Sequence, residues 1–286
     1  MEKILILGAS GNIGRAVLSH LSPDKAEIYA GLISEEEIPK ISSFPAKPIL
    51  VNFMDANSLQ QVLEGMTRVF LVTPLMPNPE QATAMLIEAA NHQGIKHIVR
   101  STAAGADSKS PYTFLRLAGL SEELLKDSGI PYIIIRPGTF LQNFINWSAT
   151  TTKSQHAFYQ AIADARMCML DLDNLGEVVA LSMQYDAHLN QTYTLSGHIY
   201  RQTEIAEILS ELLNRKISYV PVSQVQYQQS LEESQTPAWM IEALSGLNEA
   251  TIQGLLEIYS DDYQKITGKA YTTAQEFLAR HLPMFL

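Results

Sequence analysis

The chain has 286 residues, of which 46% are hydrophobic and 17% are charged, a composition typical of a folded globular protein. Its formal net charge of −10 would repel nucleic acid and anionic lipid, and its 20 lysine and arginine residues are scattered along the sequence. We therefore expect neither a nucleic-acid partner nor a membrane partner. The lone Cys168 forms no internal disulfide, and no segment resembles a signal peptide or a membrane span of roughly 20 apolar residues, so we expect a cytoplasmic protein.

Short apolar segments alternate with segments of helical periodicity in the first half of the chain. The apolar segments, each expected to form a strand, are residues 4–7, 28–30, 49–51, 69–72, 97–99 and 132–135. The helical segments between them are residues 13–21, 58–64, 80–93 and 115–126, and Gly94 and Gly129 end the last two. Since the strands are apolar at every position, we expect them to be buried on both faces of a parallel sheet. The pattern predicts an α/β fold: a Rossmann-like, doubly wound parallel sheet with helices on both faces.

The pattern weakens after Pro137. We expect a strand near 192–196 that joins the first sheet, a helix at 203–213 and a strand at 217–220. Thr273 and Glu276 form a capping-box pattern, which predicts the start of the last helix. We therefore expect a dinucleotide-binding domain at residues 1–140 and a smaller, mostly helical substrate-side lobe at residues 141–286.

A glycine-rich turn follows the first apolar segment, and it reads Gly8-Ala9-Ser10-Gly11-Asn12-Ile13-Gly14. Glycine permits a positive φ and a close approach of the backbone to a ligand, and a helical segment begins directly after the turn. The free amides and the positive dipole end of that helix would hold a diphosphate. The alternative is a tight turn with close helix-to-strand packing and no ligand. In the context of repeated βαβ units, the turn predicts a dinucleotide site.

Several later stretches carry a resemblance to a known family. They are residues 55–59, 63–71, 94–101, 128–137, 140–143, 192–197, 204–206 and 219–223. Together with the glycine turn they resemble the NmrA-like family of atypical short-chain dehydrogenases/reductases, in the family's order and over nearly the whole chain. The nearest branch is that of the bacterial quinone oxidoreductases and triphenylmethane reductase. The resemblance implies a Rossmann fold and NADP or NAD as the cofactor.

The resemblance and the rule that ligands bind at the carboxyl ends of parallel strands together imply a set of site residues. The cofactor-binding residues are Gly8, Ala9, Ser10, Gly11, Asn12, Ile13 and Gly14 for the diphosphate, Asn52 and Phe53 for the adenine side, and Thr73, Pro74, Ser101 and Pro137 at other strand ends. The residues that line the acceptor are Tyr112, Gly138, Phe140 and Asn143. Tyr112 is also the candidate for a catalytic acid, because Arg116 follows it four residues on; the alternative is a structural or substrate-lining tyrosine.

The chain departs from the family's pattern at several positions. Ile33 stands where NADP-binding relatives carry an arginine, and three glutamates follow it at residues 35–37. These glutamates either form a solvated loop or hold the ribose hydroxyls of NAD, and both interpretations leave the choice between NADP and NAD open. Asn52 replaces the usual aspartate beside the adenine, and Ala118 replaces a histidine that could donate a proton in reductase relatives.

The leading hypothesis is an NAD(P)H-dependent oxidoreductase that reduces a small apolar acceptor, such as a quinone or a dye, by direct hydride transfer. The alternative is a non-catalytic NAD(P)-sensing regulator that acts through a protein partner. A sugar-nucleotide epimerase is disfavoured, because such enzymes rely on a Tyr-x-x-x-Lys pair. The histidines and Cys168 do not cluster at metal-ligand spacing, so we expect no metal. The expected partner is a small-molecule acceptor, and a homodimer stays an open alternative to a monomer.

Overall fold

The structure, a computed structural model, describes residues 1–74 and 76–286, and the chain divides into two compact units. The first unit contains Met1–Lys109, Leu117–Arg136 and Leu172–Tyr193. The second unit contains Ser110–Arg116, Pro137–Asp171 and Thr194–Leu286. The division of the chain into domains at residues 1–140 and 141–286 stays a prediction.

The first unit is built on a seven-stranded sheet with the strand order β10-β6-β5-β4-β1-β2-β3. Its strands are β1 (Glu2–Leu7), β2 (Ala26–Leu32), β3 (Lys47–Leu50), β4 (Arg68–Leu71), β5 (His97–Ser101), β6 (Tyr132–Pro137) and β10 (Gln191–Leu195); Pro137 at the end of β6 and the last two residues of β10 are assigned to the second unit. Every pair of neighbours from β3 through β6 is parallel. Since β1 pairs with both β2 and β4, the direction of winding reverses between β1 and β4, which is where α/β folds of this kind bind ligands.

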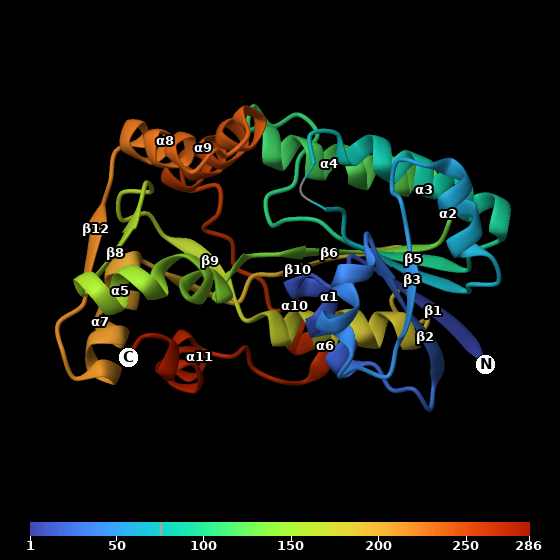
Figure 1. Ribbon diagram of the computed structural model, residues 1–286, viewed down its shortest axis with the longest axis horizontal. Helices are drawn as coiled ribbons and strands as arrows, with labels where there is room; N and C mark the ends of the chain where they lie inside the picture. Colours follow the sequence, from blue (N-terminus) through green and yellow to red (C-terminus); the bar gives the residue numbers. More distant parts are fainter. Residues whose placement is uncertain (75) are drawn as a thin grey trace. The chain divides into compact units, whose positions relative to one another are not determined.

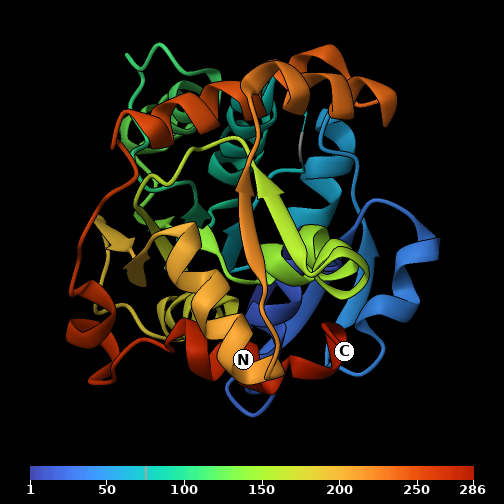
Figure 2. The same ribbon diagram turned by 90° about the vertical axis from the view of Figure 1, so that its left-hand side faces the viewer.

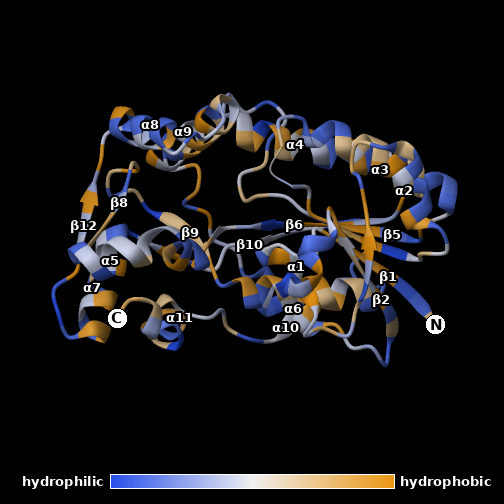
Figure 3. Cartoon of the chain, viewed as in Figure 1, coloured by the Kyte–Doolittle hydropathy of each residue, from blue (hydrophilic) through white to orange (hydrophobic). Residues whose placement is uncertain are grey.

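Helices cover both faces of this sheet (Figure 1). α1 (Asn12–His20) packs against α6 (Leu172–Gln184) on one face, and α2 (Ala56–Leu63), α3 (Pro79–Gln93) and α4 (Thr113–Asp127) lie on the other. Hydrophobic and hydrophilic residues mix along these helices (Figure 3), as expected of helices that bury one side. Leu5, Leu71 and Ile98 of the strands are fully buried in a core with residues of α2 and α3, and burial of each such side chain stabilises the fold by about 1.5–3 kcal/mol. The predicted doubly wound α/β fold is confirmed.

The observed elements of the first unit begin and end close to the predicted positions. α3 ends at Gly94, whose φ of 67° is left-handed, as the sequence pattern predicts. The three glutamates after β2 lie in a 3-10 helix, η1 (Glu35–Ile41), which the sequence analysis did not foresee. Within the described parts of the chain, no helix combines the length and the apolar character that a membrane span requires.

The second unit contains two small sheets with the strand orders β11-β9-β7 and β12-β8. Its strands are β7 (Thr139–Phe140), β8 (Ala157–Gln160), β9 (Met167–Leu170), β11 (His198–Tyr200) and β12 (Ser218–Pro221). Figure 2 shows β8 and β12 side by side, and the two strands pair in parallel. The sequence analysis predicted only β12 of these strands. All five have two to four residues, too few to show a periodicity, so the sequence gives little sign of them.

Helices make up most of the rest of the second unit. They are the π-helix η2 (Phe144–Ser148), α5 (Ala149–Gln155), α7 (Gln202–Leu213), α8 (Gln224–Glu233), α9 (Ala238–Ile252), α10 (Asp262–Thr267), α11 (Ala274–Arg280) and the 3-10 helix η3 (Leu282–Met284). Phe144 and Phe158 meet edge to face in the core of this unit, with ring centroids 5.5 Å apart. The capping box predicted at Thr273 and Glu276 is present at the start of α11.

Candidate functional site

Two of the three glycines in the turn after β1, Gly8 and Gly14, leave no space for a side chain. Gly8 has a φ of 70°, and a Cβ placed on it would lie 2.8 Å from Cγ1 of Val72 at the end of β4. A Cβ on Gly14 would lie 2.3 Å from the carbonyl oxygen of Gly8. A side chain at Gly8 would therefore clash with Val72, and one at Gly14 with the backbone of the turn itself, so both positions exclude side chains.

The third glycine plays a different part, since Gly11 is exposed and has an ordinary φ of −72°. Gly11 stands at the N-cap of α1, and among the described residues no side chain caps the helix there. The amides of the first helical turn therefore keep their hydrogen atoms free of intrahelical partners. Asn12 is exposed beside them, Ser10 and Ile13 are half-buried, and Arg15 donates a hydrogen bond of 2.8 Å to Oδ1 of Asn12.

This end of α1 fits a diphosphate. The helix dipole and the unused amides attract an anion, and the exposed Gly11 presents no side chain that would keep it away. Ala9, which is fully buried, donates its amide to the carbonyl of Gly31 at 3.3 Å and so ties the turn to the end of β2. The residues present therefore suit the diphosphate of a dinucleotide.

Two predicted residues follow β3. The side-chain oxygen of Asn52 accepts a hydrogen bond of 3.0 Å from the amide of Met54, and the amide of Asn52 donates to the hydroxyl of Ser58 at 2.9 Å. Asn52 thus fixes the turn into α2 and remains exposed. Phe53 is 4% exposed and belongs to the core of the first unit. The contact of these two residues with an adenine stays a prediction.

Three more predicted residues lie at or after strand ends in the first unit. Thr73 and Pro74 are half-buried and follow the end of β4 after one intervening residue, Val72. Ser101 ends β5, is 6% exposed, and its hydroxyl has no hydrogen-bond partner within the described chain. A buried hydroxyl without a partner is costly, so a ligand that bonds to it would gain binding energy.

The residues predicted to line the acceptor lie in the second unit, together with Pro137. Pro137 and Gly138 are buried, and the amide of Gly138 donates to the carbonyl of Leu195 at 2.9 Å. A Cβ on Gly138 would lie 2.7 Å from the carbonyl oxygen of Ser196 and 2.9 Å from Sγ of Cys168. The structure therefore gives Gly138 a packing role of its own, and its place in an acceptor site stays a prediction.

Phe140, Asn143 and Tyr112 are half-buried in the second unit. Asn143 precedes η2, and in the described structure its side chain does not cap that helix. Tyr112 packs against the core of the unit and lies next to Gly246 of α9, where a Cβ would be 3.6 Å from its ring.

The guanidinium of Arg116 makes its hydrogen bonds to the segment that precedes it in the chain. Its guanidinium donates to the carbonyls of Ser110 and Pro111 at 3.2 Å each and to the hydroxyl of Thr113 at 3.1 Å. Tyr112 itself lies one residue before the start of α4. The arginine therefore holds the loop that leads into α4, and catalysis by Tyr112 stays a prediction.

A buried charge cluster of the first unit was missed by the sequence analysis. Glu122 of α4 is 1% exposed, and Arg136 and Thr102 both donate hydrogen bonds to its carboxylate. Arg136 stands in an otherwise apolar strand, and a charged residue in such a strand requires a buried partner. That signal predicts that Arg136 has a buried acidic partner, whereas the identity of the partner, Glu122, comes from the structure alone.

The whole sequence was compared with models of known protein families. The family model described as the NmrA-like family matches residues 1–278. This chain belongs to the NmrA-like family. The resemblance that the quoted stretches carry is thereby confirmed.

Proteins similar to this chain in sequence or structure include reductases of dyes and quinones. The chain is 27% identical to the NAD(P)H azoreductase of Xenophilus azovorans over 283 residues, which cover 99% of each protein. The triphenylmethane reductase of Citrobacter sp., complexed with NADP(H), superposes with a TM-score of 0.85 at 22% identity and covers 97% of this chain and 99% of its own. The NADPH-dependent quinone oxidoreductase of Escherichia coli, complexed with NADPH, has a TM-score of 0.85 at 21% identity, over 98% of this chain and 99% of its own. At these identities the two structures show a shared fold.

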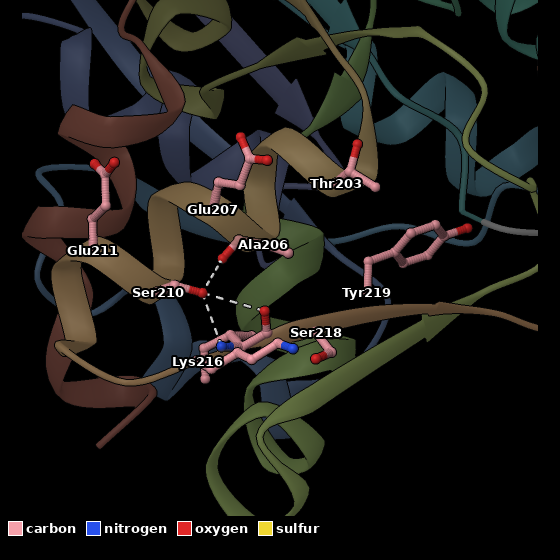
Figure 4. A pocket seen from close by; sticks show the side chains of 9 residues that line it. Thr203, Ala206, Glu207, Ser210, Glu211, Lys216, Ser218 and Tyr219 are labelled. Carbon is pink, nitrogen blue, oxygen red and sulfur yellow. Dashed lines mark hydrogen bonds between the residues drawn. The ribbon is translucent and has the colours of Figure 1, made fainter.

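A separate hollow of about 500 Å³ lies between α7 and β12 in the second unit (Figure 4). Ser210 at its base donates a hydrogen bond to the carbonyl of Ala206 at 2.7 Å and accepts one from the amide of Ile217 at 2.8 Å. Glu207, Glu211 and Lys216 also line it, and no residue of the predicted site does. The hydroxyl at its base is satisfied by the fold itself, and the hollow has no part in the site above.

Metal ligands are not gathered anywhere in the described residues. Across residues 1–74 and 76–286, no group of three or more histidine, cysteine, aspartate or glutamate side chains is placed to hold an ion. Cys168 is buried, and burial raises the pKa of its thiol, which makes the thiol less reactive. Its role is therefore to fill space in the core.

Proposed function

We propose that this chain is an oxidoreductase that uses NADH or NADPH to reduce a small apolar acceptor, such as a quinone or a dye, by direct hydride transfer. The observation that carries the proposal is the glycine turn, where Gly8 and Gly14 exclude side chains and α1 begins with uncapped amides. The activities of the azoreductase, the triphenylmethane reductase and the quinone oxidoreductase named above support the reaction class.

In this proposal the protein binds and orients the two reactants. A bound nicotinamide dinucleotide supplies the hydride. The turn from Gly8 to Gly14 holds the diphosphate through the amides of α1. The residues beside the rest of the cofactor are Asn52, Phe53, Thr73, Pro74, Ser101 and Pro137, and those beside the acceptor are Tyr112, Gly138, Phe140 and Asn143.

The proposed reaction depends on orientation more than on acid–base groups. A conjugated acceptor that receives a hydride can take its proton from water afterwards, so an aligned pair of reactants supplies most of the rate. The half-buried Phe140 and Tyr112 would give a flat apolar acceptor the aromatic surface that such ligands favour.

Gly11→Asp tests the diphosphate site. Aspartate is among the best N-cap residues, so its carboxylate should bond to the free amides of α1 and leave stability unchanged or slightly higher. The same carboxylate would take the amides from a diphosphate and repel it. We expect wild-type protein to bind NADH or NADPH in a fluorescence titration and Gly11→Asp to lose that binding, whereas the smaller Gly11→Ala loses less.

The acceptor is tested by following the absorbance of the reduced nicotinamide with a panel of quinones, triphenylmethane dyes and azo dyes. Oxidation that depends on one of these acceptors supports the proposal. Tight nucleotide binding without oxidation by any of them would instead favour a sensor of the cofactor. Failure of the wild-type protein to bind either nucleotide would overturn the proposed function.

A further inference from the structure

The end of β2 lies directly beside the glycine turn. The amide of Ala9, inside the turn, donates to the carbonyl of Gly31 at 3.3 Å, and the amide of Val51 donates to the carbonyl of Leu32 at 2.8 Å. Residues 33–37 therefore continue from a strand end that is fixed between the turn and the end of β3. In a dinucleotide-binding fold, this is the place that the adenosine ribose occupies.

The side chain of Glu37 bonds back to the backbone at the end of β2. The Glu37 carboxylate accepts a hydrogen bond of 3.0 Å from the amide of Ile33, four residues earlier in the chain. The Glu37 side chain is only 16% exposed, so the carboxylate is held in place rather than moving freely in solvent. Ile33 is 61% exposed, and it offers neither a charge nor a hydrogen-bond donor in its side chain.

The charges around this strand end are unfavourable for an anion. η1 carries three glutamates at residues 35–37 and one lysine, Lys40, which lies 3.9 Å from the Glu37 carboxylate. The hydroxyl of Ser34 bonds to Glu36 and lowers the pKa of that carboxyl, which therefore stays ionised. Arg15 of α1 is already bonded to Asn12. Lys40 and Arg15 are thus each paired with a side chain of the protein.

NADH and NADPH differ at this end of the molecule alone. NADPH carries a 2′-phosphate with a charge of about −1.5 to −2 at neutral pH, whereas NADH carries a 2′-hydroxyl that can donate a hydrogen bond to a carboxylate. A phosphate would need the Ile33 amide or a free cation, and Glu37 occupies that amide with a negative charge of its own. A 2′-hydroxyl has no such conflict.

We propose that this chain selects NADH over NADPH, and that Glu37 is the residue that determines the choice by holding its carboxylate on the Ile33 amide. The inference rests on the proposed function, since it concerns the cofactor of the same site. It sets this chain apart from the Citrobacter and Escherichia coli reductases whose structures contain NADP(H) or NADPH.

The experiment measures dissociation constants by isothermal titration calorimetry, which requires no turnover. We expect wild-type protein to bind NADH at least about tenfold more tightly than NADPH, which corresponds to about 1.4 kcal/mol. ADP and adenosine 2′,5′-bisphosphate, which lack the nicotinamide, should show the same order of affinity. Glu37→Gln should reduce the preference by about fivefold or more, because it removes the charge that repels the phosphate.

Glu36→Gln is the matched control. It removes one negative charge from the same helix, but from a carboxylate that bonds to Ser34 instead of the Ile33 amide. We expect it to change the ratio of the two constants by no more than about twofold, as for an exposed charge in water. The double variant Ile33→Arg with Glu37→Gln should bind NADPH more tightly than NADH, since a guanidinium pairs with a phosphate.

The outcomes separate the inference from the function on which it rests. Equal binding of the two nucleotides by the wild-type protein, or tighter binding of NADPH, would overturn the preference and leave the reductase in place. A preference for NADH that Glu37→Gln does not reduce would overturn the assignment of Glu37. Absence of binding to both nucleotides would overturn the proposed function itself.

Discussion

Arg136 donates two hydrogen bonds to the carboxylate of Glu122, from Nε at 2.8 Å and from Nη2 at 2.6 Å. Glu122 lies on α4 and Arg136 near the end of β6, so the pair joins a helix to the sheet within the first unit. Thr102, just after β5, donates a third hydrogen bond to the same carboxylate at 2.8 Å. The hydrogen bond with Glu122 raises the pKa of Arg136, so this guanidinium keeps its charge, and such a bidentate pair is among the stronger hydrogen-bonded contacts of a protein.

Glu122→Ala should lower the free energy of unfolding by about 3–5 kcal/mol, because it leaves the Arg136 guanidinium without its partner in a largely buried place. Lys126→Ala is the control. Lys126 lies 3.3 Å from the same carboxylate but is 35% exposed, so its loss should cost less than about 1 kcal/mol. Urea unfolding of the three proteins measures both values. Equal losses for the two variants would contradict the importance of burial for this pair.

Arg100 of β5 presents the opposite case, a buried cation without a full set of partners. It is 3% exposed, and its Nε and Nη1 atoms have no hydrogen-bond partner in the part of the chain that the structure describes. Burial lowers the pKa of Arg100 to about 10. Arg100→Met should leave the free energy of unfolding unchanged or raise it by up to about 2 kcal/mol, since a methionine fills the space without a charge.

Arg136→Met is the matched substitution for that experiment, and it should destabilise the protein because the buried Glu122 carboxylate loses its bidentate partner and keeps only Thr102 and the partly exposed Lys126. Thermal or urea unfolding distinguishes the two. A loss of more than about 1 kcal/mol in Arg100→Met would show that this cation balances the charge of Glu122 at a distance.

The buried His97 should make the free energy of unfolding depend on pH. It is 1% exposed, its Nε2 lies 3.1 Å from the carbonyl of Ser182, and burial together with the charge of Arg68 lowers its pKa from 6.5 to about 4. As the pH falls below 6.5, His97 becomes protonated in the unfolded chain, whereas in the folded chain it stays neutral until about pH 4. The contribution to stability is therefore complete above pH 6.5 and is lost towards pH 4, by about 3 kcal/mol in total.

The test compares His97→Gln with His92→Gln, whose histidine is exposed on α3. Unfolding free energies measured across this range of pH should fall less steeply for His97→Gln than for the wild-type protein, and His92→Gln should follow the wild type. A slope that His97→Gln leaves unchanged would assign the acid sensitivity to other groups.

Two helical glycines should respond oppositely to alanine. A Cβ on Gly176 of α6 would lie 2.2 Å from the carbonyl oxygen of Ala16, so Gly176→Ala should force α1 and α6 apart and cost about 1–3 kcal/mol. A Cβ on Gly246 of α9 meets nothing closer than 3.6 Å, so Gly246→Ala should be neutral or stabilise by up to about 1 kcal/mol. Melting temperatures report both changes, and similar shifts would contradict the close crossing of α1 and α6.

Tyr112→Phe should keep reductase activity within about threefold of the wild-type value, because Arg116 is bonded elsewhere and the acceptor takes its proton from water. Loss of a true general acid would instead lower kcat by about 10²–10⁴-fold. Steady-state kinetics with the best acceptor decide between the two. A loss of that size, with the KM for the acceptor unchanged, would make Tyr112 a catalytic residue.

The glycine turn was predictable because its requirements are local. Gly8 needs a positive φ and Gly14 needs contact with the backbone of Gly8, and both partners lie within a few residues of each other. Glu37 was harder to interpret, since three successive glutamates read equally well as a solvated loop. Its hydrogen bond to the Ile33 amide depends on the 3-10 turn that the chain makes there, and a weak local turn leaves no periodicity in the sequence.

The sequence by itself determined the parallel sheet, the order of the strands and α-helices from β1 to β6, and the glycine turn after β1, because apolar runs and glycine spacing act over short stretches of chain. The tertiary structure decided which distant residues meet. It brought Glu122 to Arg136 and Ala16 to Gly176, and it left Arg100 buried without a full set of partners. Such pairings follow from how helices pack on strands far away in sequence, and the side chains themselves carry no record of the partner they will find.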